Sequence, residues 1–119
     1  MKSAHVDTFA RDNLPPKAQW PEFRFDLPEL QYPPALNCAT DLLDRNVQLG
    51  HGDRTVFHFP GGHWTYNDLL TNANRIAHVL VDDFDLVPGN RVLLRAPNNP
   101  LLAACWFAVL KAGGIVVCT

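Results

Sequence analysis

Three neighbouring aspartates, Asp82, Asp83 and Asp85, are the first candidates for chemistry in this sequence. Paired carboxylates can transfer protons when burial raises the pKa of one of them. These three lie in an acidic connection that leads to the turn-forming pair Pro88-Gly89. Because such connections run over the surface, we expect the three carboxylates to be solvated rather than catalytic.

Three histidines, His51, His58 and His63, could meet around a hairpin. A metal site needs three or four converging ligands that are held by further hydrogen bonds. No cysteine or carboxylate stands at metal-binding spacing beside these histidines. We therefore interpret them as surface or edge-strand residues.

The cysteines are odd in number and far apart, at Cys38, Cys105 and Cys118. We expect reduced and mostly buried thiols, as in a cytoplasmic protein. Cys105 falls in the middle of an apolar run, where a buried thiol is inert rather than nucleophilic.

A phosphate-binding loop would need glycines directly after a strand, so that backbone N–H groups can surround the anion. Here the strand predicted at 91–96 is followed by Pro97-Asn98-Asn99-Pro100. Asn98 or Asn99 could hold an anion at the start of the next helix, but simple capping of that helix is the favoured reading. The sequence thus predicts no catalytic, cofactor-binding or metal-binding residue.

The elements that carry these residues begin near Asn37, which can cap a helix with an apolar stripe at Leu42, Leu43 and Val47. Next, residues 55–59 are rich in β-forming side chains, and Pro60-Gly61-Gly62 can turn the chain. His63 and Trp64 would then return as the second strand of a hairpin.

A capping pair, Thr65 and Asp68, predicts the start of the next helix. The apolar residues behind it recur at the spacing of an amphipathic helix. They are Leu69, Leu70, Ala73, Ile76, Ala77 and Leu80.

Residues 91–119 predict a right-handed parallel β-α-β unit. The strand at 91–96 has a continuously apolar middle, which is typical of a strand covered on both faces. The helix from Pro100 to about Ala112 is apolar nearly all round, Gly113 provides its C-terminal cap, and residues 114–119 form the second strand. The expected fold class is therefore α/β, with a short hairpin and an amphipathic helix before this unit.

Residues 1–36 have a different composition, because six of the ten prolines lie there together with several aromatic side chains. Proline fixes φ and removes a backbone donor, so few regular elements are expected. We predict an extended arm at 1–36 and an incomplete α/β subdomain at 37–119.

The net charge of −2 gives no reason to expect nucleic acid as a partner, and the longest apolar run, 101–110, is too short to cross a bilayer. With no secretion signal at the N-terminus, we expect a cytoplasmic protein without membrane or nucleic-acid partners.

Five short motifs follow one another along residues 64–114, namely Trp64–Leu70 (WTYNDLL), Asn74–Ala77 (NRIA), Gly89–Val92 (GNRV), Asn98–Pro100 (NNP) and Leu110–Gly114 (LKAGG). In this order they resemble the motifs of the adenylate-forming, AMP-binding superfamily of acyl- and aryl-CoA ligases. Asn90 replaces the aspartate that is common at its position. Within the superfamily, residues 5–16, 28–33 and 103–110 resemble benzoate- and 2-aminobenzoate-CoA ligases.

The resemblance implies the N-terminal part of the large ligase domain, which serves a parent enzyme that uses ATP, Mg²⁺ and coenzyme A. It also implies that the family's phosphate loop, aromatic-Thr-Glu motif, ribose-binding aspartate, hinge and C-terminal lysine would lie beyond Thr119. We therefore expect a truncated chain that is inactive alone. Its partner would be the remainder of the ligase, and it could self-associate through the apolar face around Trp106 and residues 114–119. The alternative is a free-standing small α/β binding module without catalysis.

Overall fold

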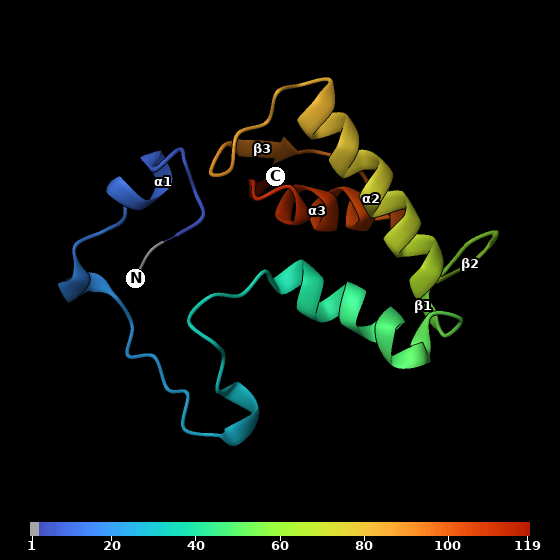
Figure 1. Ribbon diagram of the computed structural model, residues 1–119, viewed down its shortest axis with the longest axis horizontal. Helices are drawn as coiled ribbons and strands as arrows, with labels where there is room; N and C mark the ends of the chain where they lie inside the picture. Colours follow the sequence, from blue (N-terminus) through green and yellow to red (C-terminus); the bar gives the residue numbers. More distant parts are fainter. Residues whose placement is uncertain (1–2) are drawn as a thin grey trace.

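The computed structural model describes residues 3–119 and has a mixed α/β fold, as the sequence predicts. A wide N-terminal loop lies to one side of a helical body (Figure 1). The Cα radius of gyration is 16.0 Å, whereas a compact chain of this length would have about 13.5 Å. The excess reflects the extended arm.

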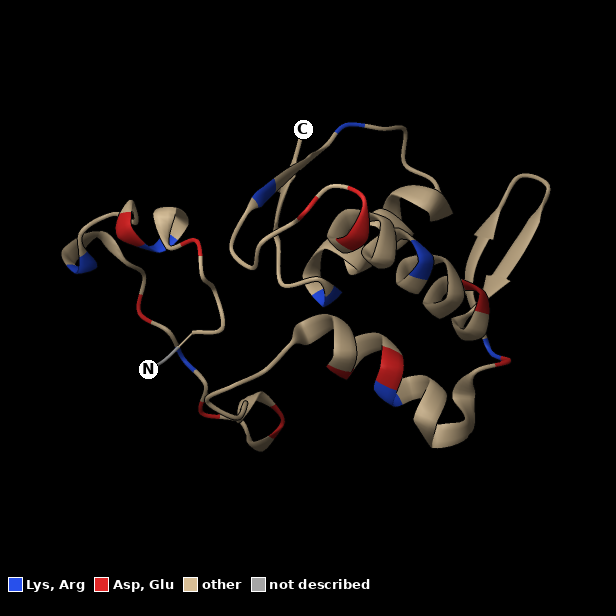
Figure 2. Ribbon diagram, turned by 45° about the horizontal axis from the view of Figure 1, so that its top comes forward, with Lys and Arg blue, Asp and Glu red and all other residues tan. Residues whose placement is uncertain are grey.

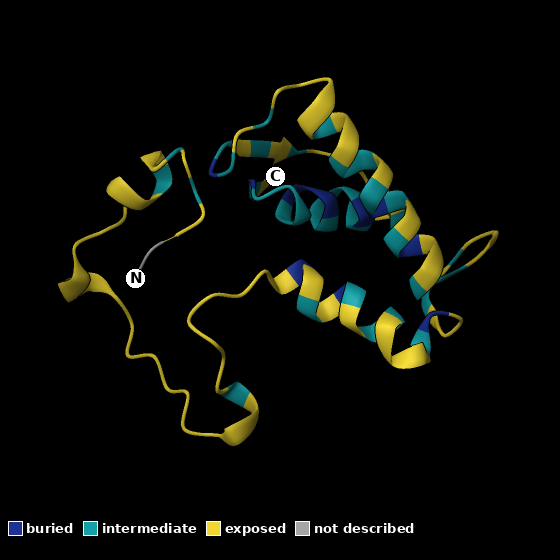
Figure 3. Cartoon of the chain, viewed as in Figure 1, coloured by how far each residue is buried: buried dark blue, intermediate teal, exposed yellow. Residues whose placement is uncertain are grey.

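The arm contains only short helical turns, α1 (Phe9–Asp12), η1 (Lys17–Gln19) and η2 (Pro28–Leu30). Pro16, Trp20 and Leu27 have backbone angles close to those of polyproline II. Four aromatic side chains of the arm pack on one another in an edge-to-face and stacked series, namely Trp20, Phe23, Phe25 and Tyr32. Most of the arm is accordingly exposed (Figure 3).

The first helix of the body spans residues 38–51 and contains two π-helical segments, η3 (Thr40–Asp44) and η4 (Val47–His51). Asn37 caps it, because its Oδ1 accepts hydrogen bonds from the N–H groups of Ala39 (3.0 Å) and Thr40 (3.3 Å). The predicted cap is thus confirmed. The helix ends around Gly50, whose φ of 82° suits glycine.

The predicted hairpin is present, with β1 (Thr55–Phe59) antiparallel to β2 (Gly62–Thr65). The register pairs Phe57 with Trp64 and His58 with His63, and it shifts between Thr55 and Phe57. The second strand leads directly into α2 (Tyr66–Asp82).

The predicted capping box of α2 is confirmed. Thr65 Oγ1 accepts from the Asp68 N–H (3.2 Å), and Asp68 Oδ2 accepts from the Thr65 N–H (2.8 Å). Each side chain therefore satisfies a backbone donor at the start of the helix.

The C-terminal part consists of β3 (Arg91–Leu94), α3 (Pro100–Lys111) and β4 (Ile115–Cys118). The two strands are parallel, with Arg91 opposite Ile115 and Leu94 opposite Cys118. The expected strand at 91–96 was two residues too long, because pairing ends at Leu94 and Pro97 follows shortly after.

The expectation that this strand is covered on both faces was wrong. Leu93 is 62% exposed and Val117 is 39% exposed, whereas Val92 and Leu94 are half-buried. Alternate side chains of a strand point to opposite faces, so α3 protects only one of the two faces. An apolar strand of this kind leaves the other face to solvent unless a second layer covers it.

The body is held by a small core between helix 38–51, the hairpin, α2 and α3. Leu43, Leu69, Ala73 and Ala104 form one buried cluster. Half-buried side chains surround it, among them Phe57, Trp64, Tyr66, Ile76 and Phe107. Figure 3 shows the buried positions concentrated where α2 and α3 lie together.

Candidate functional site

The three candidate aspartates lie at the end of α2 and in the loop that follows. All three are exposed, as expected, and Asp82 lies 3.5 Å from Nδ1 of His78 one helical turn earlier. Asp85 adopts a φ of 51°, which belongs to the left-handed region. This arrangement provides no buried carboxylate for proton transfer.

The candidate histidines lie on and near the hairpin. His58 and His63 face each other across β1 and β2, with ring centroids 6.2 Å apart, and both are exposed. His51 is half-buried and its Nδ1 lies 3.3 Å from Oδ1 of Asn46. Across residues 3–119, no three metal-ligating side chains come together.

The expectation of mostly buried cysteines was wrong for two of the three. Cys38 and Cys118 are exposed, because one lies in the first turn of helix 38–51 and the other at the end of β4. Cys105 is half-buried in α3, and burial raises the pKa of its thiol. A raised pKa keeps the thiol protonated and therefore unreactive.

At the start of α3, Asn99 is the capping residue. Its Oδ1 accepts from the N–H of Leu102 at 2.9 Å, and Pro100 occupies the first helical position. The amide oxygen therefore satisfies one of the helix's own donors, in agreement with the capping interpretation.

The C-terminal end of α3 is a junction that joins a glycine cap to contacts with helix 38–51. The N–H groups of Gly113 and Gly114 donate to the carbonyls of Leu110 (3.1 Å) and Val109 (2.8 Å), which is a Schellman motif. Gly113 has a φ of 79°, as this motif requires. The predicted glycine cap is confirmed, with Gly113 one position after the capping residue Ala112.

Two further contacts join this junction to helix 38–51. Asn37 Nδ2 donates to the carbonyl oxygen of Leu110 at 2.8 Å, and Lys111 Nζ forms an ion pair with Oδ1 of Asp44. The other carboxylate oxygen of Asp44 is buried and has no hydrogen-bond partner among the described residues. Helical spacing in a sequence relates only residues within one helix, so it does not predict contacts between residues this far apart.

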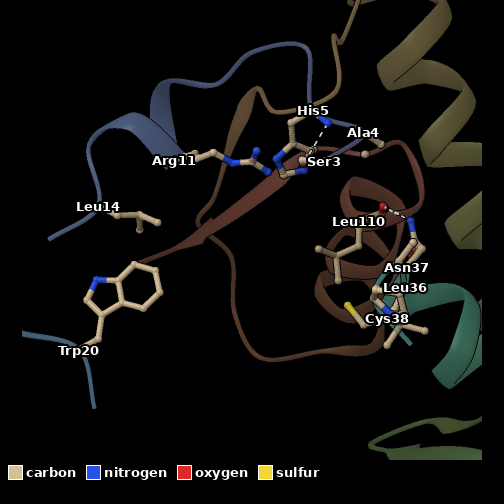
Figure 4. Close-up of a pocket in the computed structure, with 14 residues that line it drawn as sticks. Ser3, Ala4, His5, Arg11, Leu14, Trp20, Leu36, Asn37, Cys38 and Leu110 are labelled. Carbon is tan, nitrogen blue, oxygen red and sulfur yellow. Dashed lines mark hydrogen bonds between the residues drawn. The ribbon is translucent and has the colours of Figure 1, made fainter. Parts of the chain in front are cut away.

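Between this junction and the arm lies an open hollow of about 840 Å³. Figure 4 shows Arg11, Leu14 and Trp20 on the arm side, and Asn37, Cys38 and Leu110 on the body side. None of the polar side chains around it is buried, so nothing fixes a ligand in one orientation. We assign no ligand to this hollow.

Basic and acidic residues are interspersed over the elements (Figure 2). In the described part of the chain, no helix has both the length and the apolarity to cross a membrane.

The chain belongs to the AMP-binding enzyme family, whose family model matches residues 43–119. This match confirms the family resemblance seen in the motifs, and it runs from within the body's first helix to β4. The chain is also similar to several named CoA ligases, which differ in the acid they use.

Acetyl-coenzyme A synthetase of Mycobacterium tuberculosis (strain ATCC 25618 / H37Rv) is 36% identical over 84 residues, which cover 66% of this chain and 13% of the relative. Benzoate–CoA ligase of Thauera aromatica is 32% identical over 89 residues, or 75% of this chain and 17% of the relative. Long-chain-fatty-acid–CoA ligase of Bacillus subtilis (strain 168) is 40% identical over 67 residues, or 56% of this chain and 12% of the relative. The chain thus spans less than a fifth of each of these relatives.

Proposed function

We propose that this chain is the N-terminal scaffold segment of an ATP-dependent carboxylate–CoA ligase. The observation that carries the proposal is the family match over residues 43–119. In such a reaction a carboxylate displaces pyrophosphate from ATP to give an acyl-adenylate. The thiol of coenzyme A then takes the acyl group and releases AMP. Mg²⁺ would neutralise phosphate charge during the first step.

The role that we propose for the present residues is structural. Residues 1–36 would be the arm, and residues 37–119 the incomplete N-terminal subdomain, with a right-handed crossover through α3. ATP, Mg²⁺ and coenzyme A would be held by parts of a cytoplasmic parent enzyme outside this sequence. No catalytic residue is assigned here, and the isolated chain should be inactive.

For the substrate, we propose an aromatic acid such as benzoate or 2-aminobenzoate. Two observations support this choice, namely the similarity to a benzoate–CoA ligase over 75% of this chain and the motifs in the arm at 5–16 and 28–33. Other similar proteins carry the names of acetyl- and long-chain-fatty-acid ligases. The aromatic assignment therefore needs a direct comparison of acids.

The test is an assay of thioester formation by the polypeptide that the complete reading frame encodes. Benzoate, 2-aminobenzoate, acetate and a long-chain fatty acid are each supplied with ATP, Mg²⁺ and coenzyme A, and the products are identified by mass spectrometry. The proposal predicts the highest kcat/KM with an aromatic acid, and no product when ATP or coenzyme A is omitted. A preference for acetate would overturn the substrate class, and no product with any acid would overturn the ligase.

A free-standing binding module is the second candidate. The observation in its favour is that helix 38–51, the hairpin, α2 and α3 share a buried cluster without help from another chain. Against it, Leu93 and Val117 remain exposed on the small parallel sheet. Cooperative unfolding of a monomeric 119-residue chain would support the module, whereas self-association would support the scaffold.

A further inference from the structure

In the described part of the chain, hydrogen bonds join the N-terminal arm to the body at a single place. The N–H groups of Val6 and Asp7 both donate to the carbonyl oxygen of Pro88, each at 2.9 Å. Among the described residues, every hydrogen bond between segments 3–36 and 37–119 involves Val6 or Asp7. The other arm residues that the structure describes form hydrogen bonds only within the arm.

At this attachment the Asp7 carboxylate is the central group. Its Oδ1 accepts from the N–H of Phe9 at 3.0 Å, and its Oδ2 accepts from Asn90 Nδ2 at 2.9 Å and forms an ion pair with Arg91. Asn90 Oδ1 in turn accepts from the N–H of Val87 at 2.9 Å. One asparagine side chain thus joins the turn before β3 to the arm.

Two further contacts make the attachment specific. The Arg91 guanidinium lies 4.8 Å from the centroid of the Phe9 ring, within the range of a cation–π interaction. A Cβ atom on Gly89 would lie 2.0 Å from the carbonyl oxygen of Asp7, so only glycine admits the arm backbone there. The hydrogen bond from Phe9, followed by that from Asn90, lowers the pKa of Asp7 and keeps it charged at neutral pH.

We propose that residues 5–9 act as a latch, which fastens the arm to the turn Pro88–Arg91 and so forms one wall of the hollow beside α3. Of the arm residues that line the hollow, His5 lies within the latch, and Ser3, Ala4, Arg11 and Leu14 lie close to it in sequence. Trp20 and residues 34–36 complete the arm side of the hollow. Breaking the side-chain contacts of Asp7 leaves only the two backbone N–H bonds of Val6 and Asp7 to Pro88 between the described arm and the body. The arm then detaches as a unit more often, and the hollow opens. The inference does not depend on the ligase activity proposed above.

The experiment measures hydrogen exchange at the amides of Val6 and Asp7 in the full chain, together with the radius of gyration by small-angle X-ray scattering. The variants are Asp7→Ala, Arg91→Gln and the double variant. Asp26→Ala is the matched control, because Asp26 is an exposed carboxylate of the same arm without a hydrogen bond to the body.

We expect about tenfold faster exchange at the amides of positions 6 and 7 in D7A, the scale of one lost charge-assisted hydrogen bond. R91Q should also speed exchange. The double variant should lose less amide protection than the sum of the two single losses, because both substitutions remove one shared contact. The radius of gyration should rise in D7A and stay at the wild-type value in D26A.

Three results would overturn the latch. The first is equal exchange in D7A and D26A. The second is unprotected amides at Val6 and Asp7 already in the wild type. The third is a simultaneous loss of protection throughout α2 and α3 in D7A and R91Q, which would mean that these residues hold the body rather than the arm.

Discussion

At the scale of single residues, the body depends on a few polar side chains placed at helix ends. Thr65 and Asp68 satisfy each other's backbone at the start of α2, while Asn37 and Lys111 tie the end of α3 to helix 38–51. Such contacts matter here because few large side chains in residues 3–119 are fully buried, namely Leu43, Leu69 and Val109.

Replacing Thr65 with alanine should lower the free energy of unfolding by about 1 kcal/mol, because the Asp68 N–H loses its partner. Thr71→Ala is the matched control, since Thr71 is exposed in the middle of α2 and alanine is a better helix former. Urea unfolding of both variants measures the difference. Equal stabilities of T65A and T71A would contradict the capping role.

Acid should weaken the same cap. Asp68 accepts hydrogen bonds from the backbone N–H and then from the hydroxyl of Thr65, and these bonds hold its pKa below the usual aspartate range. A lowered pKa in the folded state means that the contribution is complete above about pH 4 and is lost as the pH falls further. The chemical shift of the Asp68 carboxyl carbon against pH measures this titration, and a midpoint at or above the usual value would refute the assignment.

Removing Lys111 should leave a carboxylate without its counter-ion. Asp44 and Lys111 are 22% and 14% exposed at their side chains, and one Asp44 oxygen already lacks a partner among the described residues. Lys111→Ala should therefore cost about 1–3 kcal/mol of unfolding free energy. The double variant Asp44→Ala/Lys111→Ala should lose less unfolding free energy than the two single variants lose in sum. Lys17→Ala, on the exposed arm, serves as the control, and simple additivity of the two losses would argue against the pair.

At the scale of elements, the small parallel unit depends on how α3 ends. Gly113 takes a φ of 79°, and a Cβ atom there would lie 3.2 Å from Cβ of Pro88. Gly113→Ala should therefore lower the free energy of unfolding by about 1–2 kcal/mol. Gly62→Ala in β2, where a Cβ would meet nothing closer than 3.8 Å, should change it far less. Thermal unfolding of the two variants measures both effects, and equal losses would contradict this role of Gly113.

The helices and the hairpin could be predicted because each has a local signal. The box of Thr65 and Asp68, the turn at Gly61 and the cap at Asn99 all act within a few residues, and all three are found in the structure. Solvent exposure was predicted less well. The apolar pattern of Arg91–Leu94 predicts a strand that is buried on both faces. Burial depends on which layers pack against the strand, however, and Leu93 is exposed to solvent.

For the candidate site, the sequence indicated that the three aspartates would be exposed, but it wrongly placed Cys38 and Cys118 in the interior. It also missed the contacts that join distant segments. Asp7 meets Asn90 and Arg91 across more than 80 residues of chain. Neither helical nor strand periodicity relates such positions, because periodicity describes only neighbours within one element. Asp44 and Lys111 were missed for the same reason.

At the scale of the whole molecule, the exposed apolar surface of the small sheet should drive self-association of the isolated chain. Leu93 is 62% exposed on β3, and unpaired strand edges readily pair with other chains. Leu93→Lys should reduce the concentration-dependent rise in molar mass. Leu27→Lys, at a site in the arm with 60% exposure, should leave that rise unchanged.

Light scattering across a concentration series measures the effect. A wild-type chain that stays monomeric at high concentration would contradict this prediction, as would equal effects of the two lysine variants. The first outcome would also favour the free-standing module over the scaffold.

The central claim is that residues 37–119 are scaffold of a carboxylate–CoA ligase and carry no catalytic group themselves. The most direct measurement compares ATP-dependent thioester formation from benzoate and coenzyme A by the 119-residue chain and by the polypeptide of the complete reading frame. We predict no turnover by the 119-residue chain and benzoyl-CoA formation by the longer polypeptide. Benzoyl-CoA production by the 119-residue chain alone would contradict the account.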